Sequence, residues 1–490
     1  MTDHHAIFID GRWREGGGEP LESTDPVRGD VLWAAAGASA DDVDAACSAA
    51  GRAFGPWYLA GLDARTECLR RFASVLDDRR EALAELLARE TGKALWDCRG
   101  ELAAAVNKIG ISIDSYHART GASVTEEAGT RREIRHKPHG VLAVFGPFNF
   151  PLHLPNGHIV PALLAGNTVV FKPSEITPAV AAAYLECWRE AELPDGVLNV
   201  VIGGRETGVA LAGNDGVDGI LFTGSAATGE SIHRRFAGRT GRILALELGG
   251  NNPLVLADCS DVDGAVLTII QSAFISAGQR CTCARRLVAV DSPANRAIVE
   301  RMVEVMPNIR IGDPLGDPQP FIGSLVSTAA AEAVVAAGER LVDTGGRVVV
   351  PAEHLHAAGA FVAPGLIDVT AIADPPDEEI FGPLLQLARV RDLDEAVDAA
   401  NRTRFGLAAS IITDDDDARQ RFLVESRAGV VNRNLPSTGA SSAMPFGGIG
   451  ASGNLRPSAW YAADYCARPV ASMSRDRAAA PDSLPPGITL

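Results

Sequence analysis

The fold class is decided by residues 168–202, which read TVVFKPSEITPAVAAAYLECWREAELPDGVLNVVI. The stretch opens on the apolar run Thr168–Phe171 and closes on Val197–Ile202, both of strand length and rich in β-branched residues. Between them, Ala179–Glu190 has the apolar spacing of a helix and is long enough to cross over a sheet. A strand, a crossover helix and a second strand form the repeating unit of a doubly wound α/β fold, so we expect a parallel sheet covered by helices.

The same alternation continues on both sides of this stretch. Further strands of the first set are expected at Val141–Phe145, Ile220–Phe222 and Ile243–Leu246. A second set is expected at Pro253–Leu256, Leu287–Val290, Val348–Val350, Ala408–Ile412 and Val430–Asn432, with helices near 262–276, 294–306, 393–401 and 415–426. Before the first set, an opening strand is followed by amphipathic helices at 41–54 and 63–91.

The two strand–helix series predict two α/β domains that divide near Gly249. We expect one domain to be built from residues 1–120 and 139–248, and the other from residues 249–455. The polar stretch 121–138 fits neither core, and part of it alternates like an exposed strand. It therefore predicts a projecting β-hairpin.

Bulk composition limits the classes of function. The chain has 490 residues, 46% hydrophobic and 22% charged, as in a soluble protein of more than one domain. A formal net charge of −17 argues against nucleic-acid binding, which needs clustered Lys and Arg. The first residues lack a signal-peptide pattern, and no apolar run approaches the roughly 20 residues that span a bilayer. The 8 cysteines are scattered without paired CxxC motifs, so we expect no metal site and reduced thiols in a cytoplasm.

Two glycine-containing segments have the pattern of phosphate-binding turns. Residues 448–453, GIGASG, match the dinucleotide fingerprint GxGxxG but follow no strand and open no clear helix, so a flexible loop near the active site is the better interpretation. Phe222–Gly229 instead runs from an apolar strand through Gly224 toward a helix that begins after Ser225. Such a turn directs backbone N–H groups at an anion, although an ordinary βα turn would look the same.

The strand Thr168–Phe171 is followed by two charged residues, Lys172 and Glu175, before the helix that starts at Thr177-Pro178. Both charges are therefore expected at the carboxyl end of a parallel strand, where α/β folds bind ligands. Lone charges at strand ends are usually only solvated, so this signal gains weight only together with the other candidate sites.

Three segments carry residues suited to covalent chemistry. Cys281 follows a helix that ends at Gly278, where an exposed thiol could be a nucleophile, although most single cysteines are small buried hydrophobes. Glu247 lies at a strand end among apolar neighbours and glycines, and such desolvation raises a carboxyl pKa into the range of a general base. Asn149 lies in a turn stiffened by two prolines, where its amide could donate to an oxyanion.

Together these segments resemble the aldehyde dehydrogenase family over essentially the whole chain. Glu247 and Cys281 are 34 residues apart, as the family requires, and Glu378–Pro383 is a further family block. The resemblance implies a cofactor domain, a catalytic domain and a β-element for oligomerisation. The β-element would be formed by 121–138 and 464–474, in a homo-oligomer that is a dimer or a tetramer.

The chemistry that the resemblance implies agrees with the residues. Cys281 would attack the aldehyde carbon, and the Asn149 amide with the backbone N–H of Cys281 would hold the oxyanion. Glu247 would activate the water that hydrolyses the resulting thioester. The cofactor would be NAD, bound by Lys172, Glu175, Gly224, Ser225, Gly229, Glu379, Phe381 and Phe148.

Within the family, the chain most resembles the branch that oxidises N-succinylglutamate 5-semialdehyde in the succinyl-transfer route of arginine breakdown. This closer resemblance lies in residues 148–158, 278–286 and 456–466. The loop 432–436, which in the family borders the aldehyde tunnel, departs from the expected Trp and Lys. Fewer residues therefore support the identity of the aldehyde than support the type of reaction.

The expected substrate carries two carboxylates, and an acidic chain would repel it without local positive charge. Arginines suit this task because their planar forks bind carboxylates, and the candidates near the chemistry are Arg280, Arg433 and Arg456. For each arginine, a structural ion pair is the alternative. For the activity, the alternatives are another semialdehyde as substrate, transfer of the acyl group to coenzyme A, or a non-catalytic relative. The presence of Glu247 disfavours transfer to coenzyme A. The presence of Cys281, Glu247 and Asn149 together disfavours a non-catalytic relative.

Overall fold

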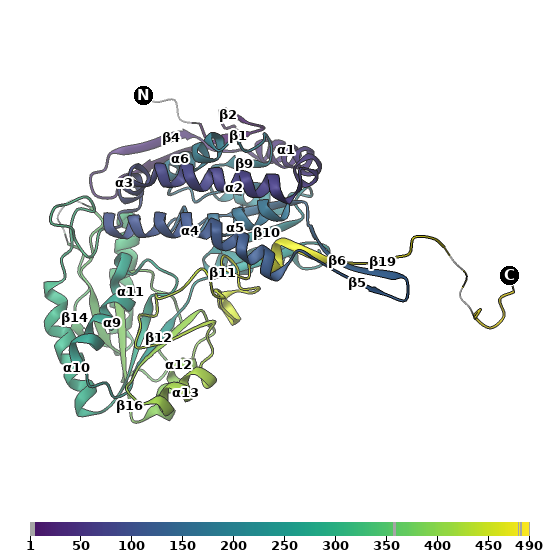
Figure 1. Cartoon of the computed structure of the whole chain (residues 1–490). Helices are drawn as coiled ribbons and strands as arrows, with labels where there is room; N and C mark the ends of the chain where they lie inside the picture. The colour runs from purple at the N-terminus through teal and green to yellow at the C-terminus, as the bar shows by residue number, and fades with distance from the viewer. Residues whose placement is uncertain (1–4, 356–358, 479, 481–482, 490) are drawn as a thin grey trace.

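Two seven-stranded sheets form the centres of two α/β domains (Figure 1). The computed structural model describes residues 5–355, 359–478, 480 and 483–489. The first sheet has the order β11-β10-β7-β8-β9-β1-β2. Its strands are β1 (Ile7–Ile9), β2 (Arg12–Arg14), β7 (Val141–Phe145), β8 (Thr168–Lys172), β9 (Leu198–Val201), β10 (Gly219–Gly224) and β11 (Ile243–Leu248). Strands β7 to β11 are parallel, as predicted, whereas β1 and β2 add an antiparallel edge.

The stretch quoted at the outset forms β8, the crossover helix α6 (Pro178–Glu190) and β9. Pro178 opens the helix because its fixed φ suits the first helical turn. On the buried face of α6, Trp188 stacks on Phe72 of α2 (Gly61–Asp78), with 3.5 Å between the ring centroids. The remaining helices of this domain are α1 (Ala40–Leu59), α3 (Arg80–Thr91), α4 (Leu95–Arg119), α5 (His153–Ala165), α7 (Arg205–Gly213), α8 (Ala226–Phe236) and α14 (Ala462–Cys466).

The stretch 63–91 is helical, as predicted, but it is divided into two helices. The segment forms α2 and α3, because Arg79 between them leaves helical geometry with φ −92° and ψ 3°. Neither glycine nor proline marks this break in the sequence. Apolar periodicity continues through it, so periodicity alone cannot locate it.

The second sheet has the order β14-β15-β16-β13-β12-β17-β18 and is parallel except for its edge strand β14. Its strands are β12 (Asn252–Leu256), β13 (Ala284–Val290), β14 (Arg347–Val350), β15 (Gly365–Asp368), β16 (Leu384–Val390), β17 (Ala408–Ile412) and β18 (Val430–Arg433). Strands β15 and β16 were not predicted. The covering helices are α9 (Val262–Phe274), α10 (Pro293–Val305), α11 (Thr328–Asp343), α12 (Leu393–Asn401) and α13 (Asp416–Glu425).

The first sheet is buried as parallel sheets require. Every residue of β7, β8 and β9 is inaccessible, which explains why these strands read as unbroken apolar runs rather than as alternating ones. The predicted division near Gly249 falls between β11, the last strand of the first sheet, and β12, the first of the second. Within the described ranges, no helix combines the length and the apolar character needed to cross a bilayer.

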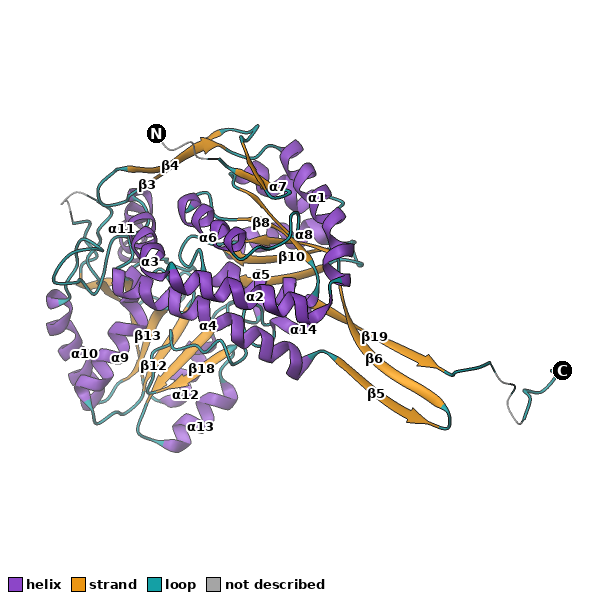
Figure 2. Cartoon of the chain, turned by 45° about the horizontal axis from the view of Figure 1, so that its top comes forward, coloured by secondary structure: helices purple, strands orange, loops and turns teal. Residues whose placement is uncertain are grey.

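A three-stranded antiparallel sheet projects from the body of the molecule (Figure 2). It pairs β5 (Ala122–Glu127) with β6 (Thr130–Pro138), and β6 with β19 (Ala467–Ser474). Two smaller strands, β3 (Pro20–Thr24) and β4 (Val31–Ala36), form a separate hairpin. The predicted hairpin at 121–138 is therefore present. The C-terminal strand β19 pairs with β6 on the side opposite β5.

Candidate active site

A cavity of about 1060 Å³ lies where the carboxyl ends of the first sheet meet the second domain. The walls from the first domain follow β7, β8, β10 and β11, and the second domain contributes Gln279, Cys281 and residues 378–381. The cavity lining includes ten of the predicted site residues, namely Phe148, Asn149, Lys172, Glu175, Gly224, Ser225, Glu247, Cys281, Glu379 and Phe381. Segments up to 233 residues apart in the sequence are thus brought to one site.

The loop that carries Cys281 is fixed by unusual backbone geometry. After α9, the short 3-10 segment η1 (Ile275–Gly278) places Ser276 and Ala277 in the left-handed region, at φ 55° and 54°. Gly278 has φ +72°, and a Cβ there would lie 2.2 Å from the carbonyl oxygen of Gly382. Only glycine fits this close approach, which directs the chain into the cavity at Cys281.

Arg285 ties the carbonyl groups of the same loop together. Its side chain is fully buried, and Nη1 donates to the Gly278 carbonyl at 2.7 Å while Nη2 donates to the Arg280 carbonyl at 2.9 Å. Its guanidinium also lies 5.3 Å from the Phe381 ring centre and 3.8 Å from Glu379 Oε1. This role was not predicted, because an isolated arginine four residues beyond Cys281 has no distinguishing sequence pattern.

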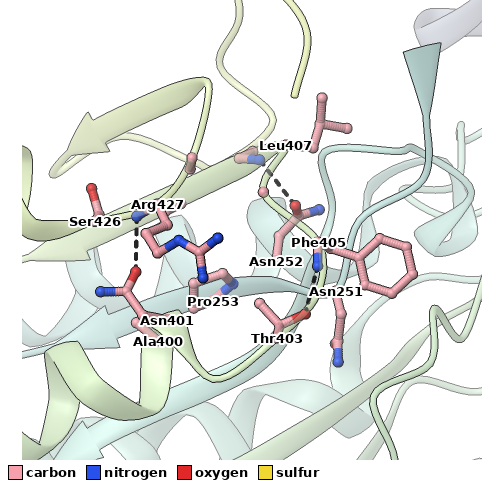
Figure 3. A pocket seen from close by; sticks show the side chains of 14 residues that line it. Asn251, Asn252, Pro253, Ala400, Asn401, Thr403, Phe405, Leu407, Ser426 and Arg427 are labelled. Carbon is pink, nitrogen blue, oxygen red and sulfur yellow. Dashed lines mark hydrogen bonds between the residues drawn. The ribbon is translucent and has the colours of Figure 1, made fainter. Parts of the chain in front are cut away.

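Asn252 holds the loop from the opposite side. Its Nδ2 donates to the carbonyl groups of Cys281 and Cys283, at 2.7 and 2.9 Å, and its Oδ1 accepts from the Ala408 N–H at 3.0 Å. Asn252 and Leu407 also line a small pocket (Figure 3). One amide therefore holds the carbonyl of Cys281 and that of Cys283.

Glu247 lies at the end of β11 with 1% of its side chain exposed. Burial raises its pKa to about 8, and a hydrogen bond with the Cys281 thiol offsets part of that increase. Within the described structure, its Oε1 has no hydrogen-bond partner. Burial, followed by the nearby charges of Glu247 and Glu379, also raises the pKa of Cys281 well above its ordinary value. The pair therefore shares protons in a nearly dry site, as a nucleophile and its base require.

Asn149 is buried in the turn that precedes α5, next to the cysteine loop. Its Nδ2 donates one hydrogen bond to the carbonyl of Gln279, at 2.9 Å. An amide nitrogen carries two hydrogens, and this bond uses only one of them. The other remains available to an oxygen that develops charge near Cys281.

The residues proposed from the sequence for the adenosine side line the outer part of the cavity. Lys172 is buried and its Nζ lies 3.3 Å from Oε2 of the half-exposed Glu175. Ser225 caps α8, since its side chain accepts from the Thr228 N–H at 3.3 Å. Gly229 does not line the cavity, because it faces the sheet, where a Cβ would lie 2.4 Å from Leu248. Its lack of a side chain brings the N-terminal end of α8 close to β11.

The residues proposed for the nicotinamide side lie close to the cysteine. Glu379 has a buried Oε1 without a hydrogen-bond partner among the described residues, and its Oε2 occupies the place where a Cβ on Gly249 would stand, 1.7 Å away. Burial raises the pKa of Glu379. Phe381 and Phe148 form an edge-on pair with 5.8 Å between the ring centroids. An unpaired acceptor beside two aromatic faces fits the ribose and ring of a nicotinamide.

The three arginines proposed for substrate binding are engaged elsewhere. Arg280 pairs with Asp97 at 2.6 Å, and Arg433 pairs with Asp416 at 2.5 Å. Arg456 donates to the carbonyl of Gly448 at 2.7 Å. Among the described residues that line the cavity, none is one of these three arginines. These contacts favour the structural alternative for each arginine, and their role in substrate binding stays a prediction.

The glycine-rich segment 448–453 is a packed loop at the back of the site. Gly453 pairs with Glu247 in an isolated β-bridge, and Asn454 accepts from the Leu246 N–H at 2.8 Å. Ser452 is fully buried and donates to the carbonyl of Gly249 at 2.7 Å. The segment therefore supports β11 near the active site, where the sequence predicted it. The prediction of a flexible loop differs from the structure, in which contacts on several sides hold the segment.

Comparison with known proteins agrees with this geometry. A model of the aldehyde dehydrogenase family matches residues 13–469. The N-succinylglutamate 5-semialdehyde dehydrogenase of Hahella chejuensis is 53% identical over 490 residues, which cover all of both chains. That of Chromobacterium violaceum is 53% identical over 485 residues, 99% of this chain and all of the relative. The structure of a Thermus 1-pyrroline-5-carboxylate dehydrogenase with bound NAD has a TM-score of 0.90 and 28% identity, covering 96% of this chain and 93% of that one.

Proposed function

Because the chain belongs to the aldehyde dehydrogenase family, we propose that it oxidises N-succinyl-L-glutamate 5-semialdehyde to N-succinyl-L-glutamate with NAD. One observation carries the chemistry: the Cys281 thiol and the buried Glu247 carboxyl line the same cavity, close enough to shift each other's pKa. The choice of aldehyde is supported by relatives that carry this activity in their names and match the chain over its full length.

The first step is addition of the Cys281 sulfur to the aldehyde carbon. Glu247 accepts the thiol proton, and the carbonyl oxygen becomes an oxyanion within a covalent thiohemiacetal. The free N–H of the Asn149 amide and the backbone N–H of Cys281 donate to that oxyanion. The Asn149 amide is held by its bond to the Gln279 carbonyl, and the peptide unit of the Cys281 N–H is held by Arg285 through the Arg280 carbonyl, so little reorganisation accompanies the step.

Bound NAD supplies the acceptor for the two electrons of the oxidation. Lys172 and Glu175 would hold its adenosine ribose, and the unpaired Oε1 of Glu379 would hold its nicotinamide ribose. Phe148 and Phe381 exclude water from the reacting face. The product of oxidation is a thioester on Cys281.

Glu247 then serves the second half-reaction. After the thiol proton has passed from Glu247 to solvent, its carboxylate accepts a proton from water, and the hydroxide adds to the thioester and expels the Cys281 thiolate. A buried carboxyl suits this task because its raised pKa makes it a stronger base than a solvated glutamate. A coenzyme A acceptor would not need this base, so its presence beside Cys281 favours water.

The remaining assignments are part of the same proposal. Residues 1–120 and 139–248 bind NAD, residues 249–455 supply the nucleophile, and the sheet formed by 121–138 and 464–474 joins copies of the chain. We place the enzyme in a cytoplasm, which is supported by eight cysteines that are all free thiols in the described structure.

The function is tested by the substitution Cys281→Ala. It removes the covalent step but no residue proposed to contact the dinucleotide, so oxidation should fall to background while NAD still quenches protein fluorescence with nearly unchanged Kd. Glu247→Ala, measured in a single turnover, should slow the release of NADH and then stall at hydrolysis, because Glu247 accepts a proton in both half-reactions. Substantial steady-state turnover by Cys281→Ala would overturn the assignment of the nucleophile.

The substrate is tested by comparing kcat/KM for N-succinylglutamate semialdehyde, succinic semialdehyde and propanal. The proposal requires the first compound to be the best of the three. A value no higher than that for propanal would leave only a general aldehyde dehydrogenase.

A further inference from the structure

One buried cation near the active site has no acidic partner. Lys108 lies on the inner face of α4 with 2% of its surface exposed, and its ammonium donates to the carbonyl oxygen of Ser458. Burial alone lowers its pKa to about 7, because no carboxylate of the described chain is close enough to support its charge. The neighbouring buried cation, Lys93, is fully paired, since its Nζ lies 2.5 Å from Glu101.

Two further polar groups beside Lys108 are also without partners. The Oγ of Ser458 and the Nδ1 of His153 are buried, and neither has a hydrogen bond to any described residue. They are close to the lysine because α5 has a glycine at the contact. A Cβ on Gly157 would lie 2.7 Å from Ser458 Oγ and 3.3 Å from Lys108 Nζ. Unsatisfied buried polar groups are costly, and two of them beside a buried ammonium without an acidic partner indicate a site for a polar ligand.

This cluster is continuous with the reacting residues. His153 stands in the first turn of α5, directly after the turn that carries Asn149. The Phe150 ring lies between His153, at 6.5 Å, and the guanidinium of Arg280, at 5.1 Å. Arg280 immediately precedes Cys281, so the contacts of the Phe150 ring join the cluster to the loop that carries the thiol.

We propose that Lys108, Ser458 and His153 form the site that binds a carboxylate of the aldehyde substrate. The proposal rests on the proposed function, which supplies a substrate with two carboxylates beyond the aldehyde. An ammonium and a hydroxyl donate to the carboxylate oxygens, and a neutral imidazole protonated on Nδ1 adds a third donor. Burial, together with Lys108 and other cations, lowers the pKa of His153, so the ring is neutral.

Charge complementarity explains why this cluster takes an anion. The nearest acids, Asp97 and Glu101, are used by Arg280 and Lys93, so the cluster keeps one uncompensated positive charge. The carbonyl of Ser458 is only a partial counter-charge. A substrate carboxylate would complete the ion pair and restore the protonated form of Lys108.

The decisive variant is Lys108→Met, compared with Lys137→Met, which removes the same charge from an exposed position on β6. Lys108→Met should lower kcat/KM for N-succinylglutamate semialdehyde at least about tenfold and for propanal less than about threefold, whereas Lys137→Met changes neither. Equal losses for both aldehydes would show that Lys108 only anchors the Ser458 loop, and no loss would show that it is not involved. Either result overturns the proposal.

Ser458→Ala provides a second test if Lys108→Met does not fold. It removes one hydroxyl and keeps the carbonyl that Lys108 holds, so it should weaken binding of N-succinylglutamate in calorimetry about threefold or more, with an unchanged melting temperature. Unchanged binding would overturn the site. If the wild-type enzyme itself does not prefer the dianionic aldehyde to propanal, the proposed function fails. If the wild type shows that preference and Lys108→Met retains it, only this site fails.

Discussion

The proton on Glu247 decides when the active site can react. Burial raises the pKa of Glu247 to about 8, so below that pH the carboxyl is neutral and accepts a proton neither from the Cys281 thiol nor from water. We therefore expect kcat/KM for propanal to rise about tenfold per pH unit up to about pH 8 and to level off above it. Propanal is chosen because it does not depend on the charge of Lys108. A flat profile between about pH 6 and about pH 9 would contradict this role for Glu247.

Cofactor choice is a second property of single residues. Lys172 is the buried cation nearest to the proposed adenosine ribose, and its pairing with Glu175 at 3.3 Å already satisfies its charge. A 2′-phosphate would meet the Glu175 carboxylate, so NAD should be preferred to NADP.

Glu175→Gln should raise the ratio of kcat/KM for NADP to that for NAD by about tenfold, because the repulsion is removed and Lys172 becomes free to pair with a phosphate. Glu300→Gln, an exposed position on α10 in the other domain, is the control. An unchanged ratio in Glu175→Gln would show that another group selects the cofactor.

At the scale of elements, the loop after the second sheet holds β11 in position. Gly453 has φ +117°, and a Cβ there would lie 2.0 Å from the Leu246 carbonyl and 3.5 Å from Glu247 Cα. Gly453→Ala should therefore push the loop away from the strand, lower kcat about tenfold or more, and reduce the free energy of unfolding by about 1–3 kcal/mol. Gly51→Ala in α1 is the matched control, because open space surrounds that position and alanine favours a helix.

Denaturant unfolding and steady-state kinetics of both variants check this expectation. If Gly453→Ala matched the wild type in kcat, bracing by the loop would not matter to Glu247. Loss of activity in Gly51→Ala as well would point to a general sensitivity of the fold to added methyl groups.

Continuous apolar patterns predicted most strands of both sheets, whereas two strands with short or interrupted patterns and several helices, among them α4 and α11, were not predicted. β16 reads LLQLARV, and its Gln386 and Arg389 interrupt the apolar run, although Gln386 is buried. Strand β15 is only four residues long and follows a proline. Both strands were missed because the prediction infers burial from runs of apolar residues, and this inference fails where a strand is short or contains a buried polar residue.

The polar stripe of α4 shows the same limit for the site. Asp97, Glu101 and Lys108 are spaced as one helix face, which in a sequence reads as a solvated surface. In the structure this face is buried against the loops that carry Asn149 and Cys281. The candidate residues Asn149, Glu247 and Cys281, which line one cavity, could be predicted, whereas the partner of Arg280, 183 positions away in the chain, could not.

For the whole molecule, the division into two domains is what creates the site. Asn149 and Glu247 come from the first domain, and Cys281 and Glu379 come from the second. A change in the angle between the domains would separate the nucleophile from its base, so contacts that span the junction bear directly on activity. The Arg280–Asp97 pair is such a contact, since α4 belongs to the first domain and the cysteine loop to the second. Its structural role is therefore connected to catalysis even without touching substrate.

The projecting sheet should set the oligomeric state. Ile134 on β6 and Met473 on β19 are 49% and 68% exposed, and the strand register places them on one face of this sheet. Exposed apolar side chains on a thin sheet are a liability unless another copy of the chain covers them. The double variant Ile134→Glu/Met473→Glu should therefore lower the mass measured by light scattering to that of a smaller assembly or a monomer, because paired copies would bury like charges. Leu59→Glu, at an 82% exposed position on α1, should leave the mass unchanged. If the double variant and the wild type had the same mass, association through this face of the sheet would be excluded.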